Sequence, residues 1–173
     1  TYGGPEYETG SSLGSLLGID DLTALCKANE ICNAYGMDTI AAGATMAWAM
    51  ECFDRGLMTP ADTGGLDIRF GDPDMVVKLT EMIGRREGFG DLLADGVARA
   101  AERFGNGSEQ YAMHVKGQEL PMHEPRAKHL IGLGYAVSPT GADHVHNVHD
   151  VWYESGEGDW FNRIRSLGVL EPI

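Results

Sequence analysis

Asn33-Ala34-Tyr35-Gly36-Met37-Asp38 is the stretch around which the fold is organised. Residues 20–35 before it carry apolar side chains at helical spacing, and residues 38–55 after it form a second helical run that is nearly free of charge. Gly36 is a typical helix stop, and Asp38 is a typical N-cap for the next helix. The stretch therefore predicts two buried helices that meet at a polar corner.

The same corner has the chemistry of a small-molecule site. The first N–H groups of the second helix point back toward Gly36, where they favour an anion such as phosphate. Capping by Asp38 accounts for the aspartate without any ligand, and the local chemistry by itself favours capping.

Two more helices are indicated downstream. Asp72 and Pro73 form a cap-and-proline start for a helix that we expect to end at Gly88. Asp91 is expected to cap another helix that runs to Gly105. Each helix has one apolar stripe, so both are packing elements.

Strand signals are sparse. Residues 111–115 are compatible with a short strand, residues 127–137 with a small-residue helix, and two prolines frame His123 and Glu124 in a loop. The predicted fold class is mainly α: a bundle of packed helices with glycine-rich loops and at most a short strand.

The composition limits the function. The chain has 173 residues, 43% of them hydrophobic, and a formal net charge of −13. This charge argues against nucleic-acid backbone or an anionic membrane surface as a partner. No apolar run reaches the roughly 20 residues of a membrane span. Three cysteines within helical runs argue against a disulfide framework and for a reducing, cytoplasmic compartment.

The N-terminal segment offers a pair of carboxylates. If residues 5–9 are extended, Glu6 and Glu8 point the same way and Tyr7 points opposite. Adjacent carboxylates raise one pKa when they are buried, and this suits proton transfer. A solvated acidic loop is the alternative.

Histidines gather nearer the C-terminal end. His144, His146 and His149 have a spacing compatible with zinc, although it matches no standard pair motif. One histidine acting as a general acid or base near pH 7, or simply hydrogen-bonded loop histidines, are the alternatives. We assign no metal ligand from this pattern.

Six segments carry a further signal. They are Gly4-Pro5-Glu6-Tyr7-Glu8-Thr9, Leu17-Gly18-Ile19-Asp20-Asp21-Leu22, residues 29–40 around the corner, Ala47-Trp48-Ala49-Met50-Glu51-Cys52, Arg86-Glu87-Gly88-Phe89-Gly90-Asp91-Leu92-Leu93-Ala94 and Lys116-Gly117-Gln118-Glu119-Leu120-Pro121. In this order they resemble the aldehyde:ferredoxin oxidoreductase family of tungsten enzymes, over most of residues 3–150.

The resemblance implies an activity that requires several domains and cofactors, and this chain would supply only some of their residues. The family oxidises aldehydes to carboxylic acids and passes electrons to ferredoxin, with a tungsten (or molybdenum) bis-pterin cofactor and a [4Fe-4S] cluster. Residues 1–173 resemble its first helical domain, so an N-terminal β domain, a C-terminal helical domain and the cluster ligands would lie outside them. The implied partners are those domains, ferredoxin, the aldehyde and, in a homodimer, a second copy.

The corner resembles the family's Asp-x-x-Gly-Leu-Asp/Cys pterin-binding motif. This resemblance gives Asn33, Gly36, Met37 and Asp38 a cofactor-binding role. Asn replaces the first Asp of the motif and removes its charge, and Met replaces Leu. The corner is then half of a clamp whose partner motif lies elsewhere.

The resemblance also implies catalytic side chains. Glu8 matches a glutamate near tungsten that handles protons, and Tyr7 beside it lines the site in some members. His144, in Gly-Ala-Asp-His, matches a histidine that contacts substrate or a tungsten ligand. His123 stands where members often have Tyr, which bears on the substrate range, and His146 falls near a cofactor-contacting position.

Three other functions fit parts of the sequence. One is a reductase of the same superfamily that does not use aldehydes, similar to an aryl-CoA reductase subunit. Another is a histidine–metal hydrolase built on His144, His146 and His149. The third is a helical module without catalysis. We predict aldehyde oxidation by the complete enzyme.

Overall fold

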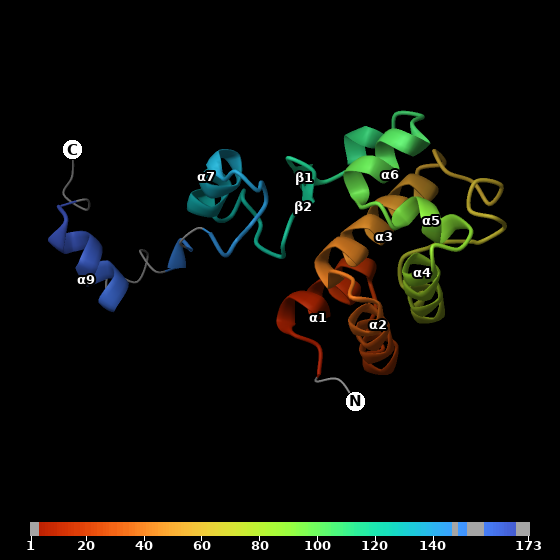
Figure 1. Cartoon of the computed structure of the whole chain (residues 1–173), viewed down its shortest axis with the longest axis horizontal. Helices are drawn as coiled ribbons and strands as arrows, with labels where there is room; N and C mark the ends of the chain where they lie inside the picture. The colour runs from red at the N-terminus through yellow and green to blue at the C-terminus, as the bar shows by residue number, and fades with distance from the viewer. Residues whose placement is uncertain (1–3, 147–148, 152–157, 169–173) are drawn as a thin grey trace.

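A computed structural model describes residues 4–146, 149–151 and 158–168, and helices dominate these residues (Figure 1). A small antiparallel hairpin pairs β1 (His114–Val115) with β2 (Gln118–Glu119). The helices and 3-10 turns (η) are α1 (Tyr7–Leu13), η1 (Ser15–Leu17), α2 (Leu22–Tyr35), α3 (Thr39–Asp54), α4 (Pro73–Arg85), α5 (Phe89–Leu93), α6 (Val97–Phe104), η2 (Ser108–Tyr111), α7 (His129–Val137) and α9 (Asp159–Ser166). The predicted mainly α fold class is confirmed.

The corner between α2 and α3 forms as the sequence predicts. Gly36 adopts a left-handed backbone, with φ 69° and ψ 34°, and its N–H closes the end of α2 on the carbonyl of Cys32. Asp38 caps α3, and its Oδ1 accepts hydrogen bonds from the N–H groups of Ile40 and Ala41 at 2.8 and 3.0 Å.

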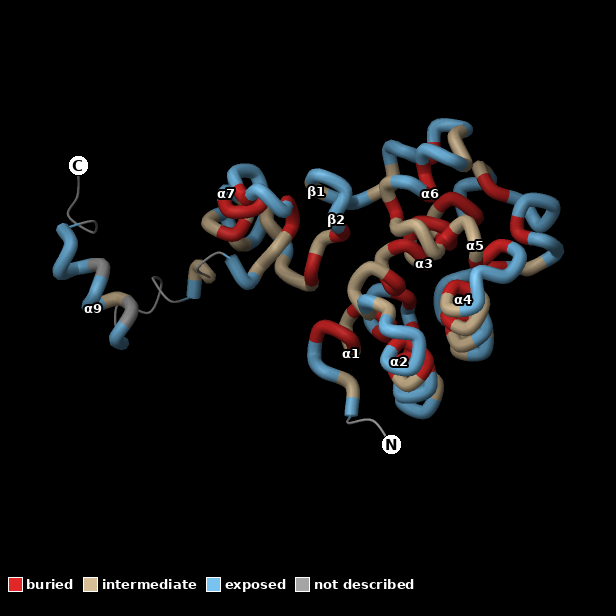
Figure 2. The backbone as a smooth tube through the Cα atoms, in the orientation of Figure 1, coloured by how far each residue is buried: buried red, intermediate tan, exposed pale blue. Residues whose placement is uncertain are grey.

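The core is built around α3. Figure 2 shows buried positions along this helix and on the neighbouring helices. α3 is apolar on nearly all sides, and it contributes the largest share of the main buried cluster: Ala42, Met46, Trp48, Ala49, Met50, Cys52 and Phe53. A helix without a polar face can be stable only when other elements surround it.

α1 lies unusually close to α3. A Cβ at Gly43 would come within 2.5 Å of the carbonyl oxygen of Ser12, so only glycine permits this contact. Hydrogen bonds fix the contact: the Ser12 hydroxyl donates to the carbonyl of Thr39 at 3.0 Å, and the hydroxyls of Thr9 and Thr39 are 2.7 Å apart. This packing holds the first turn of α1 beside the corner.

The extended conformation expected for residues 5–9 is wrong. α1 begins at Tyr7, because the Glu6 side chain caps it by accepting the N–H of Glu8 at 2.8 Å. Tyr7 and Glu8 therefore do not point to opposite sides, and the Tyr7 hydroxyl reaches the Glu8 carboxylate.

The helix expected from Asp91 to Gly105 is two helices. Gly96, with φ 82° and ψ 164°, separates α5 from α6. Asp91 lies inside α5 and pairs with Arg86 and Arg103, and the N–H of Val97 in α6 donates to Glu119 at 2.6 Å.

Two further boundaries differ from the prediction. α4 ends at Arg85, and Arg86 rather than Gly88 takes the left-handed cap position with φ 53°. The strand expected at residues 111–115 is shorter, because Tyr111 belongs to η2 and only His114 and Val115 pair with β2.

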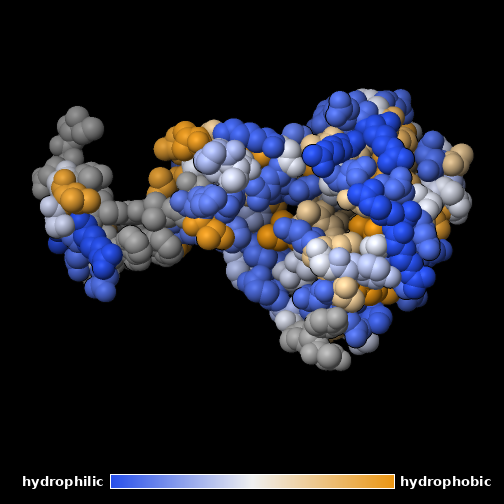
Figure 3. All heavy atoms as spheres, viewed as in Figure 1, coloured by the Kyte–Doolittle hydropathy of each residue, from blue (hydrophilic) through white to orange (hydrophobic). Residues whose placement is uncertain are grey.

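α7 and the loops around it form a second, smaller core. Ile131, Tyr135 and Ala142 pack together there, with Val115 and Leu120 against them. Leu133 and Val137 on the same helix are 59% and 69% exposed. In Figure 3 apolar side chains gather around α7, whereas much of the visible surface elsewhere is hydrophilic.

In the described part of the chain, no helix combines the length and the apolar character that crossing a membrane requires.

The three thiols should react differently. Cys26 is exposed, whereas Cys32 and Cys52 are buried, and burial raises the pKa of both buried thiols to about 11. At pH 8 only about one in a thousand of such thiols is ionised. Iodoacetamide at pH 8 should therefore label one cysteine of the native protein and three after denaturation, as counted by mass spectrometry. Rapid labelling of all three in the native protein would contradict the burial.

Candidate active site

The candidate site lies where the first turn of α1 meets the loop after β2. Glu8 is only 4% exposed there, which is unusual for an acidic side chain. A buried carboxylate is costly unless hydrogen bonds or charges compensate it. The surroundings of Glu8 therefore define the chemistry of the site.

Both carboxylate oxygens of Glu8 are engaged. Oε2 accepts the backbone N–H of Met122 at 2.7 Å, and Oε1 accepts the hydroxyl of Tyr7 at 2.9 Å. Nε2 of His123 lies 3.0 Å and Nε2 of His144 lies 3.6 Å from the same Oε1. The structure thus brings together the four residues that the sequence assigned to catalysis.

Three imidazoles gather next to this carboxylate. The ring centroid of His123 is 4.8 Å from that of His144 and 4.6 Å from that of His149. Nε2 of His149 lies 3.2 Å from the carbonyl oxygen of His144. His149 therefore supports the position of His144.

The protonation states of His123 and Tyr7 follow from their burial. Burial lowers the pKa of His123, and the neighbouring His144 and His149 add to this effect, while the Glu8 charge opposes it. Burial, together with the hydrogen bond to Glu8, raises the pKa of Tyr7 to about 12. At pH 7 the site thus offers a neutral imidazole on His123 and a protonated phenol on Tyr7.

His146 lies outside this cluster. Its side chain is exposed, and Nδ1 is 3.0 Å from Oδ2 of Asp143 and 3.2 Å from Oγ1 of Thr140. Among the described residues, the ligand atoms that converge belong to Glu8, His123 and His144. The zinc hypothesis built on His144, His146 and His149 is therefore wrong.

Most of the predicted cofactor corner shares one pocket with two members of the acid–base cluster. This pocket has a volume of about 490 Å³ and is lined by Glu8 and His144, by Asn33, Met37 and Asp38 of the corner, and by neighbours in α1 to α3. Gly36 lines instead an adjoining pocket of about 430 Å³ toward α4. Met37 and Asp38 border both pockets.

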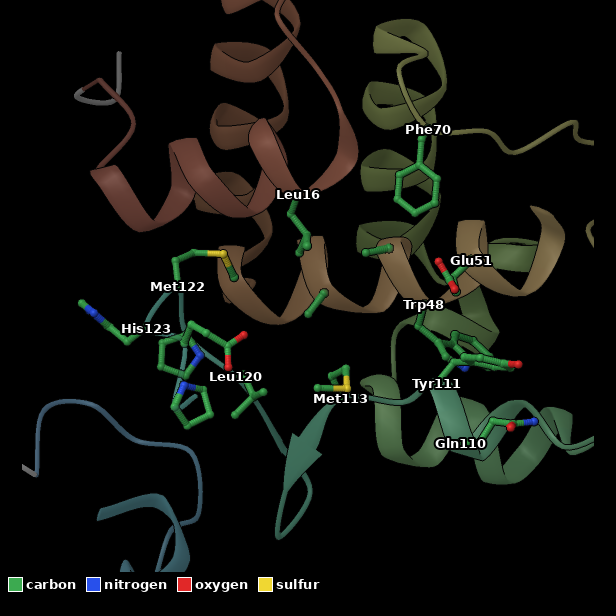
Figure 4. A pocket seen from close by; sticks show the side chains of 15 residues that line it. Leu16, Trp48, Glu51, Phe70, Gln110, Tyr111, Met113, Leu120, Met122 and His123 are labelled. Carbon is green, nitrogen blue, oxygen red and sulfur yellow. The ribbon is translucent and has the colours of Figure 1, made fainter. Parts of the chain in front are cut away.

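A larger pocket of about 710 Å³ is mostly apolar, and the loop after β2 forms part of its wall (Figure 4). Trp48, Tyr111, Met113 and Phe70 line it, and His123 lies at its edge, apart from the tryptophan and tyrosine. Its size does not make it the candidate site, because the acid–base groups other than His123 are not on its wall.

Sequence reasoning missed two groups that shape the site. The backbone N–H of Met122 carries no side-chain signal at all, and its role is visible only when the loop is placed. Tyr135, in α7, donates its hydroxyl to the carbonyl of His123 at 3.1 Å. An aromatic residue on an apolar helix indicates only a core position.

Together, the fold and this cluster define a helical module built around a buried acid–base site. The family model described as "Aldehyde ferredoxin oxidoreductase, domains 2 & 3" matches residues 1–167. The chain belongs to the aldehyde ferredoxin oxidoreductase family.

Individual relatives agree with this family. The chain is similar to the tungsten-containing aldehyde ferredoxin oxidoreductases of Pyrococcus abyssi, with 48% identity, and of Pyrococcus furiosus, with 41% identity. These matches cover 82% and 83% of this chain and 24% of each relative. The chain thus spans about a quarter of the length of these relatives.

One relative and one solved structure carry other names. An aliphatic sulfonate oxidoreductase, WOR-like subunit, of Pyrococcus furiosus is 33% identical over 82% of this chain and 23% of its own. The active site complex BamBC of benzoyl coenzyme A reductase, in complex with 1,5-dienoyl-CoA, matches with a TM-score of 0.62 and 29% identity. That match covers 76% of this chain and 20% of the other.

The hydroxyl of Tyr135 should stabilise the loop that carries His123. Tyr135→Phe leaves the carbonyl of His123 without this donor, so unfolding should become easier by about 1–3 kcal/mol. Tyr35→Phe is the matched control, because its hydroxyl is on the surface and should matter by less than about 0.5 kcal/mol. Urea denaturation measures both, and equal effects would refute the assignment.

Proposed function

We propose that this chain is the first helical domain of a larger tungsten-pterin enzyme that oxidises aldehydes to carboxylic acids and passes the electrons to ferredoxin. One observation carries the proposal: Glu8, His144 and three corner residues, Asn33, Met37 and Asp38, line a single pocket in a chain of this family. The names of the relatives supply the metal, the substrate class and the electron acceptor.

The residues of the pocket fit a pterin. Its N–H groups and ring nitrogens require carboxylate and amide partners. Asp38 uses only Oδ1 for the cap of α3, and Asn33 donates its amide nitrogen to Asn29 at 2.8 Å, so an oxygen of each side chain takes no part in these contacts. The volume of about 490 Å³ is in the usual range for a small-molecule site.

The chain's own contribution would be proton transfer. When bound, the tungsten pterin supplies the two-electron chemistry. Conversion of an aldehyde and water into a carboxylic acid releases two protons with two electrons. Oε1 of Glu8 accepts a proton, and Nε2 of His123, 3.0 Å away on a neutral ring, takes it onward. His144, whose Nε2 lies 3.6 Å from the same Oε1, would orient the substrate carbonyl.

The remaining parts of the enzyme would complete the site. We place the [4Fe-4S] ligands outside these residues, because the three cysteines cannot supply four thiolates and two of them are buried in helices. We place the second half of the pterin clamp there as well. The exposed apolar side chains of Leu133 and Val137 suit cover by another domain. Three free thiols suit a reducing compartment such as the cytoplasm.

A second candidate is a reductase of the same superfamily acting on aromatic thioesters. The match to the benzoyl coenzyme A reductase complex favours it. By the family resemblance, His123 stands where members often have Tyr, and this would change a side chain that faces the substrate. Assays of the complete protein with aldehydes and with aromatic CoA thioesters separate the two: turnover of thioesters alone would replace our proposal.

Removal of the Glu8 charge should slow turnover. Glu8→Gln keeps the shape and the acceptor for the Met122 N–H but cannot accept a proton, so turnover of the complete enzyme should fall by roughly 10²–10⁴-fold. Tungsten and pterin content, measured by elemental analysis and fluorescence, should be unchanged. Glu102→Gln, on the exposed side of α6, is the control. Wild-type turnover of Glu8→Gln would refute the role.

Asp38 offers a test that separates capping from cofactor binding. Asp21 caps α2 with the same two hydrogen bonds, at 2.8 and 3.0 Å, but does not line the pocket. Asp38→Ala and Asp21→Ala should each destabilise the protein by about 1 kcal/mol. Only Asp38→Ala should also reduce the pterin content. Equal pterin content in both variants would leave Asp38 with a capping role alone.

A further inference from the structure

The atoms around Glu8 also have the arrangement of a metal site. Oε1 of Glu8 lies 3.0 Å from Nε2 of His123 and 3.6 Å from Nε2 of His144. One ligand atom from each of the three residues lies within 4.8 Å of the others. The three side chains are only 6%, 18% and 23% exposed, so water competes weakly for them.

We propose that Glu8, His123 and His144 bind a divalent transition-metal ion of the zinc class when the tungsten pterin is absent. In a tetrahedral zinc site with bonds of about 2.0–2.1 Å, neighbouring ligand atoms are about 3.4 Å apart. The two measured distances lie on either side of this value. Small side-chain rotations would therefore suffice to admit the ion.

The donor set selects the class of ion. Two imidazole nitrogens and one carboxylate oxygen suit zinc, iron, cobalt or nickel, whereas magnesium and calcium prefer oxygen ligands alone. Three protein ligands leave one coordination position for water. Tyr7, whose hydroxyl now contacts Glu8 and His123, would have to yield its hydrogen bond to Oε1.

Neighbouring contacts already orient the three ligands. The Met122 N–H occupies Oε2 of Glu8, so Oε1 is the oxygen presented to an ion. Tyr135 holds the backbone of His123, and His149 contacts the backbone of His144. Such supporting contacts commonly set the geometry and affinity of metal ligands.

The ion would occupy the same groups that proton transfer requires. A consequence, which rests on the proposed function, is that bound zinc should slow aldehyde oxidation. The two proposals nevertheless fail separately, because metal binding can be measured without turnover. Stoichiometric zinc binding by a protein that oxidises no aldehyde would retain the metal site and remove the proposed function. Aldehyde oxidation by a protein that shows no stoichiometric zinc binding would retain the proposed function and remove the metal site.

The test is a zinc titration of the protein expressed without tungstate. Calorimetry should show one zinc ion per chain. Glu8→Gln, His123→Ala and His144→Ala should each weaken binding at least tenfold. His146→Ala is the matched control, since His146 is an exposed neighbour paired with Asp143, and it should bind zinc within twofold of the wild type.

A second measurement uses only the wild-type protein, so it still tests the proposal if a variant fails to fold. Zinc should shift the imidazole NMR signals of His123 and His144 and leave those of His114 and His129 in place. Absence of stoichiometric binding, equal weakening by His146→Ala, or shifts confined to other histidines would each overturn the proposal.

Discussion

A buried carboxylate, that of Glu8, joins the two parts of this molecule. Glu8 belongs to α1 in the helical body, and its partners Met122, His123 and His144 belong to the segment that leads into and surrounds α7. A carboxylate with 4% exposure would be costly without such partners. The contacts that compensate it therefore also link the histidine-bearing loops to the helical body.

α3 provides the platform for this arrangement. Its N-terminus carries Asp38 and the corner, and Gly43, one turn further on, lets α1 approach to direct backbone contact. The same helix thus places the candidate cofactor residues and, through α1, the acidic residue of the acid–base cluster. This explains why two features that are separate in sequence open into one pocket.

The family assignment and the geometry support each other at different levels. The family model and the relatives show the family to which the chain belongs, and the match covers 24% of the relative from Pyrococcus abyssi. The pocket shows which of this chain's residues face one another. Proton transfer is a function that these residues can perform, while electron chemistry requires groups that we place in the rest of the enzyme. The exposed apolar side of α7 is consistent with that division.

The sequence by itself determined the local structure: the helices on both sides of Gly36, the cap by Asp38 and the mainly α class. Such signals act over one or two turns, so they need no distant partner. Only the tertiary structure decided which histidines meet Glu8. The Met122–Glu8 bond spans 114 positions and the Glu119–Val97 bond 22, and no local pattern encodes either. For this reason spacing suggested His144 with His146 and His149, whereas packing united His144 with His123 and Glu8.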